Sequence, residues 1–259
     1  MNLLQKPVLN PSASKFRIIP ILIYSFWVTF VGSIKTVFHG VFLHRNNITK
    51  SRQKIDGVTT QWGTRIINSA KVDWELIGDL ESQIPKDRAV ILMCNHACAY
   101  DIPLAFASIP GSIRMIAKKE LFKIPILSRA LKSGEFLSID RQNRSQAIED
   151  LKFAHEKMKS GIRIWMFPEG TRSEDGSLKP LKKGGIRLAI DTNAIIIPIV
   201  MQDIQHILPN KKWLKMRLGQ KVKIKIGEAI DCKEYSSADR HNLTELVYNR
   251  MKQLLDERS

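Results

Sequence analysis

A histidine and an aspartate lie five residues apart in the segment NHACAYD, residues 95–101, which directly follows the apolar run 89–94. A carboxylate that holds one imidazole nitrogen leaves the other free to act as a general base. His96 and Asp101 could not share one face of a regular helix, because five residues turn it by about 140°. They can meet if His96 lies in a loop and Asp101 begins the next helix, where Pro103 is tolerated in the first turn. Taken alone, the pattern fits a helix-capping Asp101 and an unrelated histidine better.

A second segment, FPEGTRS at residues 167–173, has the composition of an anion-binding loop. It follows another apolar run, and Gly170 permits a close backbone approach while Thr171 offers a hydroxyl. Arg172 supplies a planar fork that matches phosphate oxygens, and Glu169 can hold that arginine or orient the loop. We interpret the segment as an anion pocket and not as a nucleotide-binding loop.

Three further basic residues stand after apolar runs or at an expected helix start. Lys118 comes directly after residues 113–117, and Arg141 comes just past residues 136–139. Lys183 stands at the expected start of a helix, where free amides and the helix dipole favour an anion. A single loop charge is usually solvated, but basic groups after successive strands together favour a phosphate-binding site.

Short apolar runs alternate with helical patterns over most of the chain. We predict strands over residues 72–77, 89–94, 113–117, 136–139, 162–167 and 195–200, and helices over residues 120–132, 143–160 and 239–257. Pro125 interrupts the first helix, and Asn143 can cap the start of the second while Gly161 can end it. This alternation predicts an α/β fold with a mixed, mostly parallel central sheet flanked by helices. Sites in such folds gather at strand ends, where both motifs lie.

The segment 18–34 contains seventeen residues without a formal charge, between Arg17 and Lys35, and a second apolar run continues to His44. As a helix it would span roughly 26 Å, slightly short of a ~30 Å hydrocarbon core unless Lys35 is buried or reaches the surface. Basic residues flank the segment on both sides, so the positive-inside rule fixes no orientation for a single membrane span. Basic flanks on both sides suit a hairpin that enters one leaflet and returns to the same surface. We expect membrane insertion or surface anchoring; a buried core helix and a cleaved signal peptide are the alternatives.

From residue 49 to residue 70 the apolar residues recur at spacings of three and four. This is typical of an amphipathic helix that lies along the membrane or caps the core. No internal repeat or low-complexity linker follows it in the sequence. We therefore predict a membrane-anchoring helical segment over residues 1–70 and one catalytic domain over residues 71–259.

Composition and charge limit the partners. With 44% hydrophobic residues the chain can bury a core, which excludes overall disorder, and 41 basic against 25 acidic residues give a formal charge of +16. This charge points to nucleic acid, an anionic membrane surface or a phosphorylated substrate. The basic segment 211–227 carries no nucleic-acid-binding signature, and its alternating lysines fit a strand with a solvated lysine face against anionic lipid. We expect no nucleic-acid partner.

The cysteines and histidines argue against two classes of site. Cys94, Cys98 and Cys232 contain no CxxC pair, so neither a disulfide framework nor a cysteine-rich zinc site is expected, and a reducing cytosolic setting fits best. The six histidines show no HExxH spacing, so we predict no metal. A cysteine hydrolase that uses Cys98 with His96 is a further alternative, but it leaves Arg172 unexplained.

Four motifs, in order, resemble those of the 1-acyl-sn-glycerol-3-phosphate acyltransferase family, the lysophosphatidic acid acyltransferases. NHACAYD resembles the first, GEFLSIDR at residues 134–141 the second, FPEGTRS closely the third, and IIPIV at residues 196–200 the fourth. AKKEL at residues 117–121 and LKKGG at residues 181–185 are also similar to the family, so the resemblance covers about residues 72–230. Cys98 departs from the pattern, because the family more often has serine there.

The resemblance implies transfer of a fatty acyl group from acyl-CoA or acyl carrier protein to the 2-hydroxyl of lysophosphatidic acid, giving phosphatidic acid in phospholipid biosynthesis. His96 would act as the base and Asp101 would orient it, with no metal, cofactor or acyl-enzyme. The acceptor phosphate would be held by one group of residues: Glu169, Gly170, Thr171, Arg172, Lys118, Arg141 and Lys183. Together with the apolar N-terminal segment and the unpaired cysteines, we expect a membrane-associated protein whose catalytic domain faces the cytoplasm. A family member acting on another lysolipid and a non-catalytic basic membrane-binding protein are the alternatives.

Overall fold

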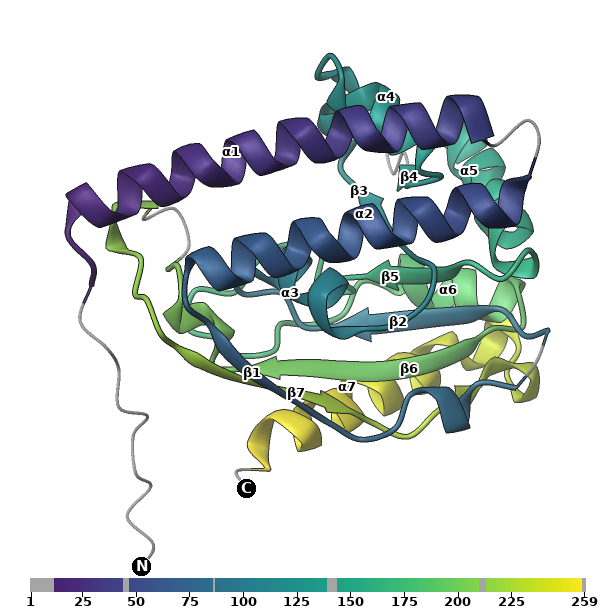
Figure 1. Ribbon diagram of the computed structural model, residues 1–259. Helices are drawn as coiled ribbons and strands as arrows, with labels where there is room; N and C mark the ends of the chain where they lie inside the picture. The colour runs from purple at the N-terminus through teal and green to yellow at the C-terminus, as the bar shows by residue number, and fades with distance from the viewer. Residues whose placement is uncertain (1–11, 44–46, 86, 139–143, 210–212, 258–259) are drawn as a thin grey trace, which may run out of the picture.

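The computed structural model describes residues 12–43, 47–85, 87–138, 144–209 and 213–257 (Figure 1). Its helices are α1 Lys15–Phe38, α2 Ile48–Ser69, α3 Asp101–Ser108, α4 Leu127–Ser133, α5 Arg144–Lys159, α6 Lys183–Asp191 and α7 Arg240–Asp256. Its strands are β1 Asp73–Ile77, β2 Val90–Cys94, β3 Ile113–Ala117, β4 Leu137–Ser138, β5 Arg163–Met166, β6 Ile195–Gln202, β7 Lys221–Ile226 and β8 Ile230–Asp231. Every strand predicted from the sequence is present, within two residues at either end.

The strands form one eight-stranded sheet in the order β1-β7-β6-β2-β5-β3-β4, with β8 beside β6. Neighbours along this order pair in parallel except at β6, to which β7 and β8 run antiparallel. The predicted fold class, a mixed and mostly parallel sheet flanked by helices, is confirmed. Because β2, β3 and β5 run in the same direction, their carboxyl ends reach the same edge of the sheet.

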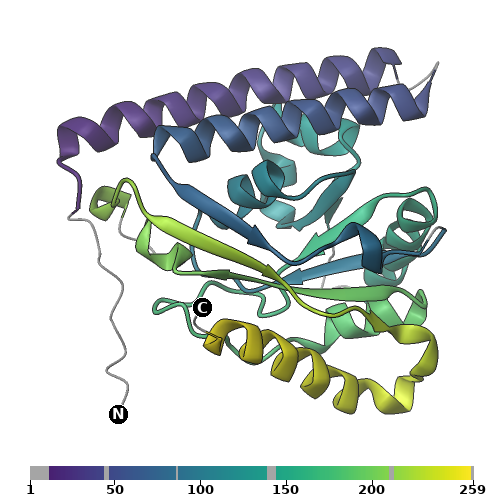
Figure 2. The same ribbon diagram turned by 60° about the horizontal axis from the view of Figure 1, so that its bottom comes forward.

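Helices cover both faces of the sheet (Figures 1 and 2). Residues of α1, α2 and α3 pack on one face, and residues of α5, α6 and α7 pack on the other. The central strand β2 is buried on both sides, with Leu92 and Cys94 facing the first layer and Ile91 and Met93 facing the second. This explains why its sequence is continuously apolar instead of alternating.

Two ion-pair networks fix α2 to the sheet. Arg52 donates to both carboxylate oxygens of Glu135 at 2.6 and 2.9 Å, and Lys157 donates to the same group at 2.6 Å. Asp56 accepts from the fully buried Arg114 at 2.7 Å. Burial alone would raise the pKa of Glu135, but the hydrogen bonds from Arg52 and Lys157 outweigh it and lower that pKa to about 2. The helix is therefore held on the sheet by charge as well as by apolar packing.

Helix α1 is longer than the seventeen-residue run predicted from the sequence. It continues through Lys35, whose side chain is exposed, and passes into the π-helical segment η1 His39–Leu43. The apolar helix Lys15–Leu43 has 29 residues and is long and apolar enough to cross a membrane. It lies alongside α2 in both views (Figures 1 and 2), and Trp62 of α2 donates a hydrogen bond to the Thr29 hydroxyl at 2.9 Å.

The two parts predicted for the chain share one core in the structure. Ile18 of α1 and Ile66 of α2 belong to the same buried cluster as Leu92 of β2 and Val222 of β7. The division into residues 1–70 and 71–259 stays a prediction about function. In packing terms, the helix pair α1 and α2 forms the outer layer of one body.

The helix predicted over residues 120–132 is broken in two. A 3-10 segment, Lys119–Lys123, precedes Pro125, and α4 begins only at Leu127. The residue before a proline is pushed out of helical geometry, and Ile124 is accordingly extended with φ −76° and ψ 120°. Helix α5 is followed by Gly161 at φ +89°, where the sequence placed its end, whereas Asn143 lies outside the described residues.

The prediction of a solvated lysine face on β7 is wrong at its last lysine. Lys221 is exposed, but Lys225 is buried and donates to the Glu257 carbonyl. The C-terminal end of α7 packs over this part of the strand, where Gln202 of β6 also donates to the Leu254 carbonyl at 3.0 Å. The lysine face thus lies on the α7 side of the sheet, opposite the layer formed by α1 and α2.

The contact between α2 and α3 depends on a glycine, and this leads to a test. A Cβ at Gly63 would lie 2.4 Å from the Pro103 carbonyl oxygen and 3.0 Å from the Ala107 nitrogen. We expect Gly63→Ala to lower the free energy of unfolding by about 1–3 kcal/mol, because the two helices must separate. A Cβ at Gly57 of the same helix would meet no atom within 4 Å, so Gly57→Ala should raise the free energy of unfolding by up to about 1 kcal/mol. Thermal unfolding of the full-length protein in detergent measures both; equal shifts would contradict the tight contact.

Candidate active site

His96 and Asp101 meet at the carboxyl end of β2. His96 lies in the loop that leaves the strand, and Asp101 is the first residue of α3. Nδ1 of His96 and Oδ2 of Asp101 are 2.5 Å apart. Because the carboxylate holds Nδ1, Nε2 is the ring nitrogen left for proton transfer. The structure brings together two residues that the sequence pattern alone left unconnected, and their catalytic roles stay predictions.

The Asp101 carboxylate is fully buried and surrounded by donors. Its Oδ2 also accepts from the backbone nitrogen of Ala97 at 2.8 Å and from that of Cys98 at 3.0 Å. An unpaired carboxylate would be costly to bury, so these bonds hold the loop in one conformation around it. The position of the His96 ring therefore depends on how the loop wraps Asp101.

Phe167 supports the His96 ring from a neighbouring strand. It directly follows β5, and the two rings stack with centroids 4.0 Å apart and an interplanar angle of 14°. The stacked ring fixes the tilt of the imidazole and shields one of its faces. Sequence analysis assigned Phe167 no role, although it is the first residue of FPEGTRS and stood next to the residues that were assigned one.

Glu169 joins the FPEGTRS loop to the His96 loop. Oε1 accepts from the backbone nitrogen of His96 at 2.7 Å, and Oε2 accepts from that of Lys179 at 2.8 Å. Of the two roles suggested for Glu169, this is the orientation of the loop; both oxygens bond backbone amides, and within the described residues no bond connects them to Arg172. Burial raises the pKa of Glu169 to about 7, more than the amides of Lys179 and His96 lower it.

Asn95 provides a further connection that sequence analysis did not assign. Its side-chain oxygen accepts from the Met201 nitrogen at 2.8 Å, and its amide nitrogen donates to the Met201 carbonyl at 3.3 Å. These bonds fasten the residue before His96 to β6. The sequence signal that could have identified Asn95 was a polar residue placed directly between an apolar strand and a candidate base.

A cavity of about 440 Å³ opens beside the His96 ring. His96, Arg172 and Lys118 line it together with apolar side chains of α2, α3 and α4 and their neighbouring segments, among them Trp62, Phe106, Leu127 and Phe136. Helix α1 contributes small and hydroxyl-bearing residues: Thr29, Gly32, Ser33 and Thr36. In the described part of the chain the Arg172 guanidinium has no hydrogen-bond or ion-pair partner, although the Arg172 carbonyl accepts from Lys179 Nζ at 2.6 Å. Two cations and an imidazole thus meet a largely apolar cavity.

The other predicted binding residues are distributed differently. Gly170 has φ +74°, a conformation that favours glycine, and Gly170 and Thr171 are both exposed on the loop. Lys183, the first residue of α6, is exposed and does not line the cavity. Arg141 lies outside the described residues. Over the described ranges no group of three or more His, Cys, Asp or Glu side chains could hold a metal ion.

Cys98 is poorly placed to act as a nucleophile. It is fully buried, and burial, followed by the charge of Asp101, raises the pKa of its thiol to about 12. Its sulfur accepts from the Tyr100 nitrogen at 3.4 Å. A thiol held in the protonated form is a weak nucleophile, so the geometry does not favour a cysteine hydrolase.

Comparisons with known proteins agree with this geometry. The Acyltransferase family model matches residues 79–202. A 1-acyl-sn-glycerol-3-phosphate acyltransferase of Cocos nucifera is 38% identical over 137 residues, which are 52% of this chain and 44% of that protein. The crystal structure of the 1-acyl-sn-glycerophosphate acyltransferase PlsC from Thermotoga maritima, 30% identical, superimposes with a TM-score of 0.69 and covers 94% of this chain and 99% of that one. The chain belongs to the 1-acyl-sn-glycerol-3-phosphate acyltransferase family.

Family membership confirms the resemblance drawn from the motifs. A relative in Borreliella burgdorferi, also named 1-acyl-sn-glycerol-3-phosphate acyltransferase, is 29% identical over 174 residues, 67% of this chain and 68% of that protein. The chain spans about half the length of the first curated relatives, 44% of the Cocos protein and 57% of a Caenorhabditis elegans protein. His96, Asp101 and Arg172 all fall within the region that the family model matches.

The perturbed carboxyl of Glu169 should make stability depend on pH. The folded-state pKa of Glu169, about 7, exceeds the ordinary 4.5, so the folded protein favours the protonated carboxyl. The stability that this carboxyl contributes is therefore fully present below about pH 4.5 and is lost as pH rises through 7. Relative to Glu169→Gln, the parent's free energy of unfolding should fall by about 2–3 kcal/mol between about pH 5 and 8. Denaturant titrations in detergent across this range measure it. The exposed Glu174 of the same loop provides the control, Glu174→Gln; a pH-independent difference for Glu169→Gln would contradict the expectation.

Proposed function

We propose that this protein transfers a fatty acyl group from an acyl thioester to the 2-hydroxyl of lysophosphatidic acid, giving phosphatidic acid. The observation that carries this proposal is the His96–Asp101 pair at the wall of an apolar cavity that Arg172 also lines. An acceptor with a hydroxyl, an acyl chain and a phosphate requires a general base, an apolar space and a cation that is free to bind it, and in the described part of the chain the Arg172 guanidinium has no other partner.

The reaction uses His96 as both base and acid. Nε2 takes the proton of the acceptor hydroxyl, and Asp101 stabilises the imidazolium that forms. The alkoxide oxygen attacks the thioester carbonyl, and the tetrahedral intermediate collapses with cleavage of the carbon–sulfur bond. The thiolate leaves with the proton from Nε2, which restores the neutral imidazole. The thioester donor is already activated, so the acceptor can attack it directly and no acyl-enzyme is needed. Acyl-CoA and acyl carrier protein both fit this chemistry.

The acceptor is recognised by charge at one end and by apolar contact along its chain. Arg172 forms a bidentate pair with the phosphate monoester, and Lys118 adds a second positive charge from the loop after β3. Gly170 and Thr171 shape the loop that carries Arg172. Choice of lysophosphatidic acid over other lysolipids then follows from the demand for a dianionic headgroup.

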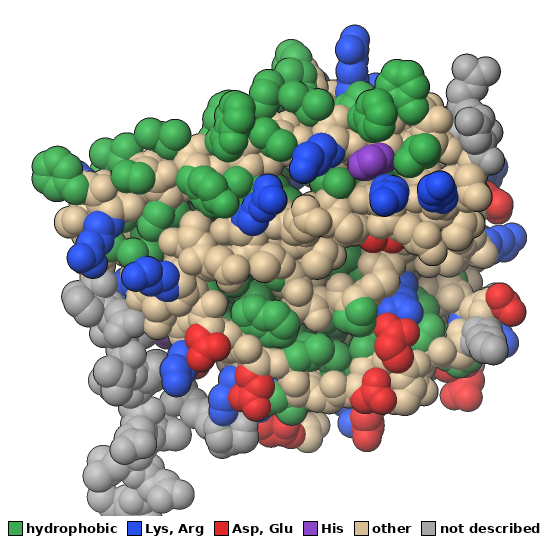
Figure 3. All heavy atoms as spheres, in the orientation of Figure 1, with side chains coloured by type: hydrophobic (Ala, Val, Ile, Leu, Met, Phe, Trp, Pro, Cys, Tyr) green, Lys and Arg blue, Asp and Glu red, His purple; other side chains and the backbone are tan. Residues whose placement is uncertain are grey.

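Membrane docking brings the lipid acceptor to the cavity. Figure 3 shows a band of apolar side chains along α1 and its continuation η1. The most exposed large apolar residues of these two segments are Phe16, Ile23, Phe26, Trp27 and Phe42. Burying these five would supply on the order of 10 kcal/mol before ordering costs. The opposite side of α1 contacts α2 and α4, so lipid cannot surround the helix, and we place it within one leaflet instead of across the bilayer. Free, buried cysteines fit a cytoplasmic location.

Substitutions at the His–Asp pair test the proposed reaction. We expect His96→Ala to abolish acyl transfer and Asp101→Asn to reduce it on the order of 10³ to 10⁴-fold, because the imidazole loses its orientation. Cys98→Ser in the same loop is the matched control and should keep near-parental activity. Purified protein is assayed in detergent with labelled acyl-CoA or acyl carrier protein and a panel of lysophospholipids. An active His96→Ala protein, or an inactive and folded Cys98→Ser protein, would exclude this mechanism.

Substitutions at Arg172 test recognition of the phosphate. Arg172→Ala should raise KM for lysophosphatidic acid roughly 10- to 100-fold, because a charge-assisted hydrogen bond to the phosphate is lost. KM for the acyl donor should stay nearly unchanged. Arg172→Lys should rescue partly, because it keeps the charge and loses the bidentate fork. Lys183→Ala, exposed and outside the cavity, serves as the charge control. Equal effects on both substrates would indicate a structural role for Arg172.

A further inference from the structure

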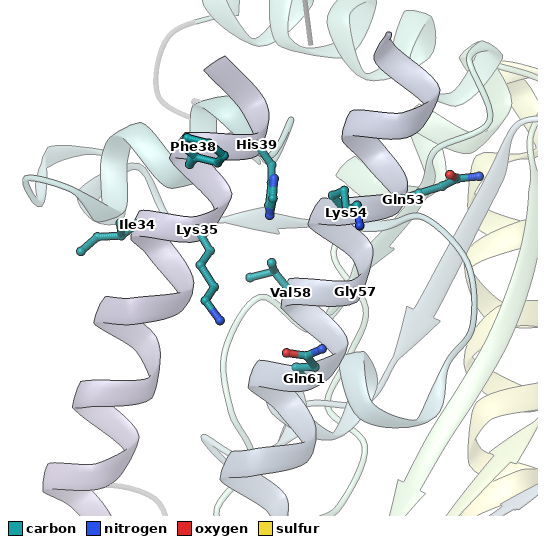
Figure 4. A pocket seen from close by; sticks show the side chains of 9 residues that line it. All are labelled: Ile34, Lys35, Phe38, His39, Gln53, Lys54, Gly57, Val58 and Gln61. Atoms are coloured by element: carbon teal, nitrogen blue, oxygen red, sulfur yellow. The ribbon is translucent and has the colours of Figure 1, made fainter. Parts of the chain in front are cut away.

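An open pocket of about 660 Å³ lies between α1 and α2, apart from His96 and Arg172. Figure 4 shows Lys35 and His39 extending from α1 and its continuation η1 into the space between the helices, while Val58 extends toward them from α2. Gln53, Lys54 and Gln61 of α2 complete its polar lining. We name this pocket the basic groove.

None of the described residues that line the basic groove is acidic. Lys35 and Lys54 form no ion pair within the described residues, in contrast to Arg52 of the same helix pair, which is bound to Glu135. Nδ1 of His39 is buried without a hydrogen-bond partner in the described structure. Burial, then the charges of Lys54 and Lys35, lower the pKa of His39. Both lysines thus face His39 from different helices, and an anion between the three side chains would be attracted by both charges.

The apolar wall of the groove points to a lipid as the source of that anion. Ile34 and Phe38 line the groove and are also exposed on the apolar face of α1. Figure 3 shows lysine or arginine side chains and a histidine along the lower border of the apolar band. A ligand in the groove therefore meets cations at one end and a lipid-facing surface at the other. A soluble anion would use only the cations.

We propose that the basic groove binds the phosphate of an anionic phospholipid whose acyl chains lie against the exposed face of α1. Lys35 and Lys54 hold the phosphate, and His39 offers a ring nitrogen. The choice of a lipid over free phosphate rests on the proposed membrane docking of α1. Such a lipid is not the acceptor, because the groove contains no residue of the His96 and Arg172 loops. It sets the depth of the helix pair at the headgroups.

Lipid retention by the full-length protein tests this proposal. The protein is purified in detergent, mixed with equal amounts of phosphatidylglycerol and phosphatidylcholine that carry the same acyl chains, and analysed by native mass spectrometry. We expect the parent to retain phosphatidylglycerol preferentially. Lys35→Gln with Lys54→Gln should reduce that preference at least about fivefold, the factor for one lysine beside anionic lipid. The control variant, Lys15→Gln with Lys50→Gln, removes the same charge from exposed positions of the same helices and should keep the preference for phosphatidylglycerol.

Two further arms separate the sources of the signal. Arg172→Ala, which disables the proposed acceptor site, should keep the preference, and excess inorganic phosphate should not displace the lipid. Loss of the preference in Arg172→Ala, displacement by phosphate, or equal retention by the parent and the groove variant would each overturn the proposal. If the parent retains neither lipid, the proposed membrane docking fails; if it retains both equally, docking stands and the groove site does not.

Discussion

The buried carboxylate of Asp101 is the contact on which the arrangement of the site depends. It is excluded from solvent and satisfied by the His96 ring together with the amides of Ala97 and Cys98. Removing any one donor would leave a buried charge short of a partner, which is costly inside a protein. The loop, the start of α3 and the imidazole are therefore fixed as one unit. This unit places the His96 ring, with Nε2 unbound by Asp101, at the wall of the cavity.

Neighbouring strands extend this constraint to the rest of the site. β5, β2 and β6 lie side by side, so the loops that follow them are close by topology. Side chains then fix the distances, because Glu169 bonds the His96 amide and Asn95 bonds both backbone polar groups of Met201. Each of these side chains satisfies main-chain groups at a strand end, where the sheet no longer does so. The FPEGTRS loop and His96 are thus held at a constant separation.

The sequence alone predicted the sheet and the two motifs, because both depend on local information. Periodicity and turn residues placed the strands, and the His–Asp spacing could be tested against helix geometry. The contacts that were missed involve distant partners: Arg52 and Glu135 are 83 residues apart, and no local pattern connects them. Lys225 looked solvated because alternation reveals two faces of a strand but not which helix covers one of them. The sequence left the end of the first helix open, because a single lysine between two apolar runs does not decide whether one helix continues through it.

The helix pair α1 and α2 separates two environments that the proposed reaction must connect. On one side Gly32, Thr36 and Trp62 line the cavity beside His96, and on the other side α1 exposes an apolar face. Val58 lines both this cavity and the basic groove, so one side chain stands between them. Because Arg52 and Asp56 tie α2 to the sheet, the helix pair cannot tilt without straining buried ion pairs. In the proposed docking, the height of the cavity above the membrane is therefore set by the same contacts that hold the fold together, and the proposed acceptor would reach His96 between the hydroxyl-bearing face of α1 and the apolar side chains of α2 and α3.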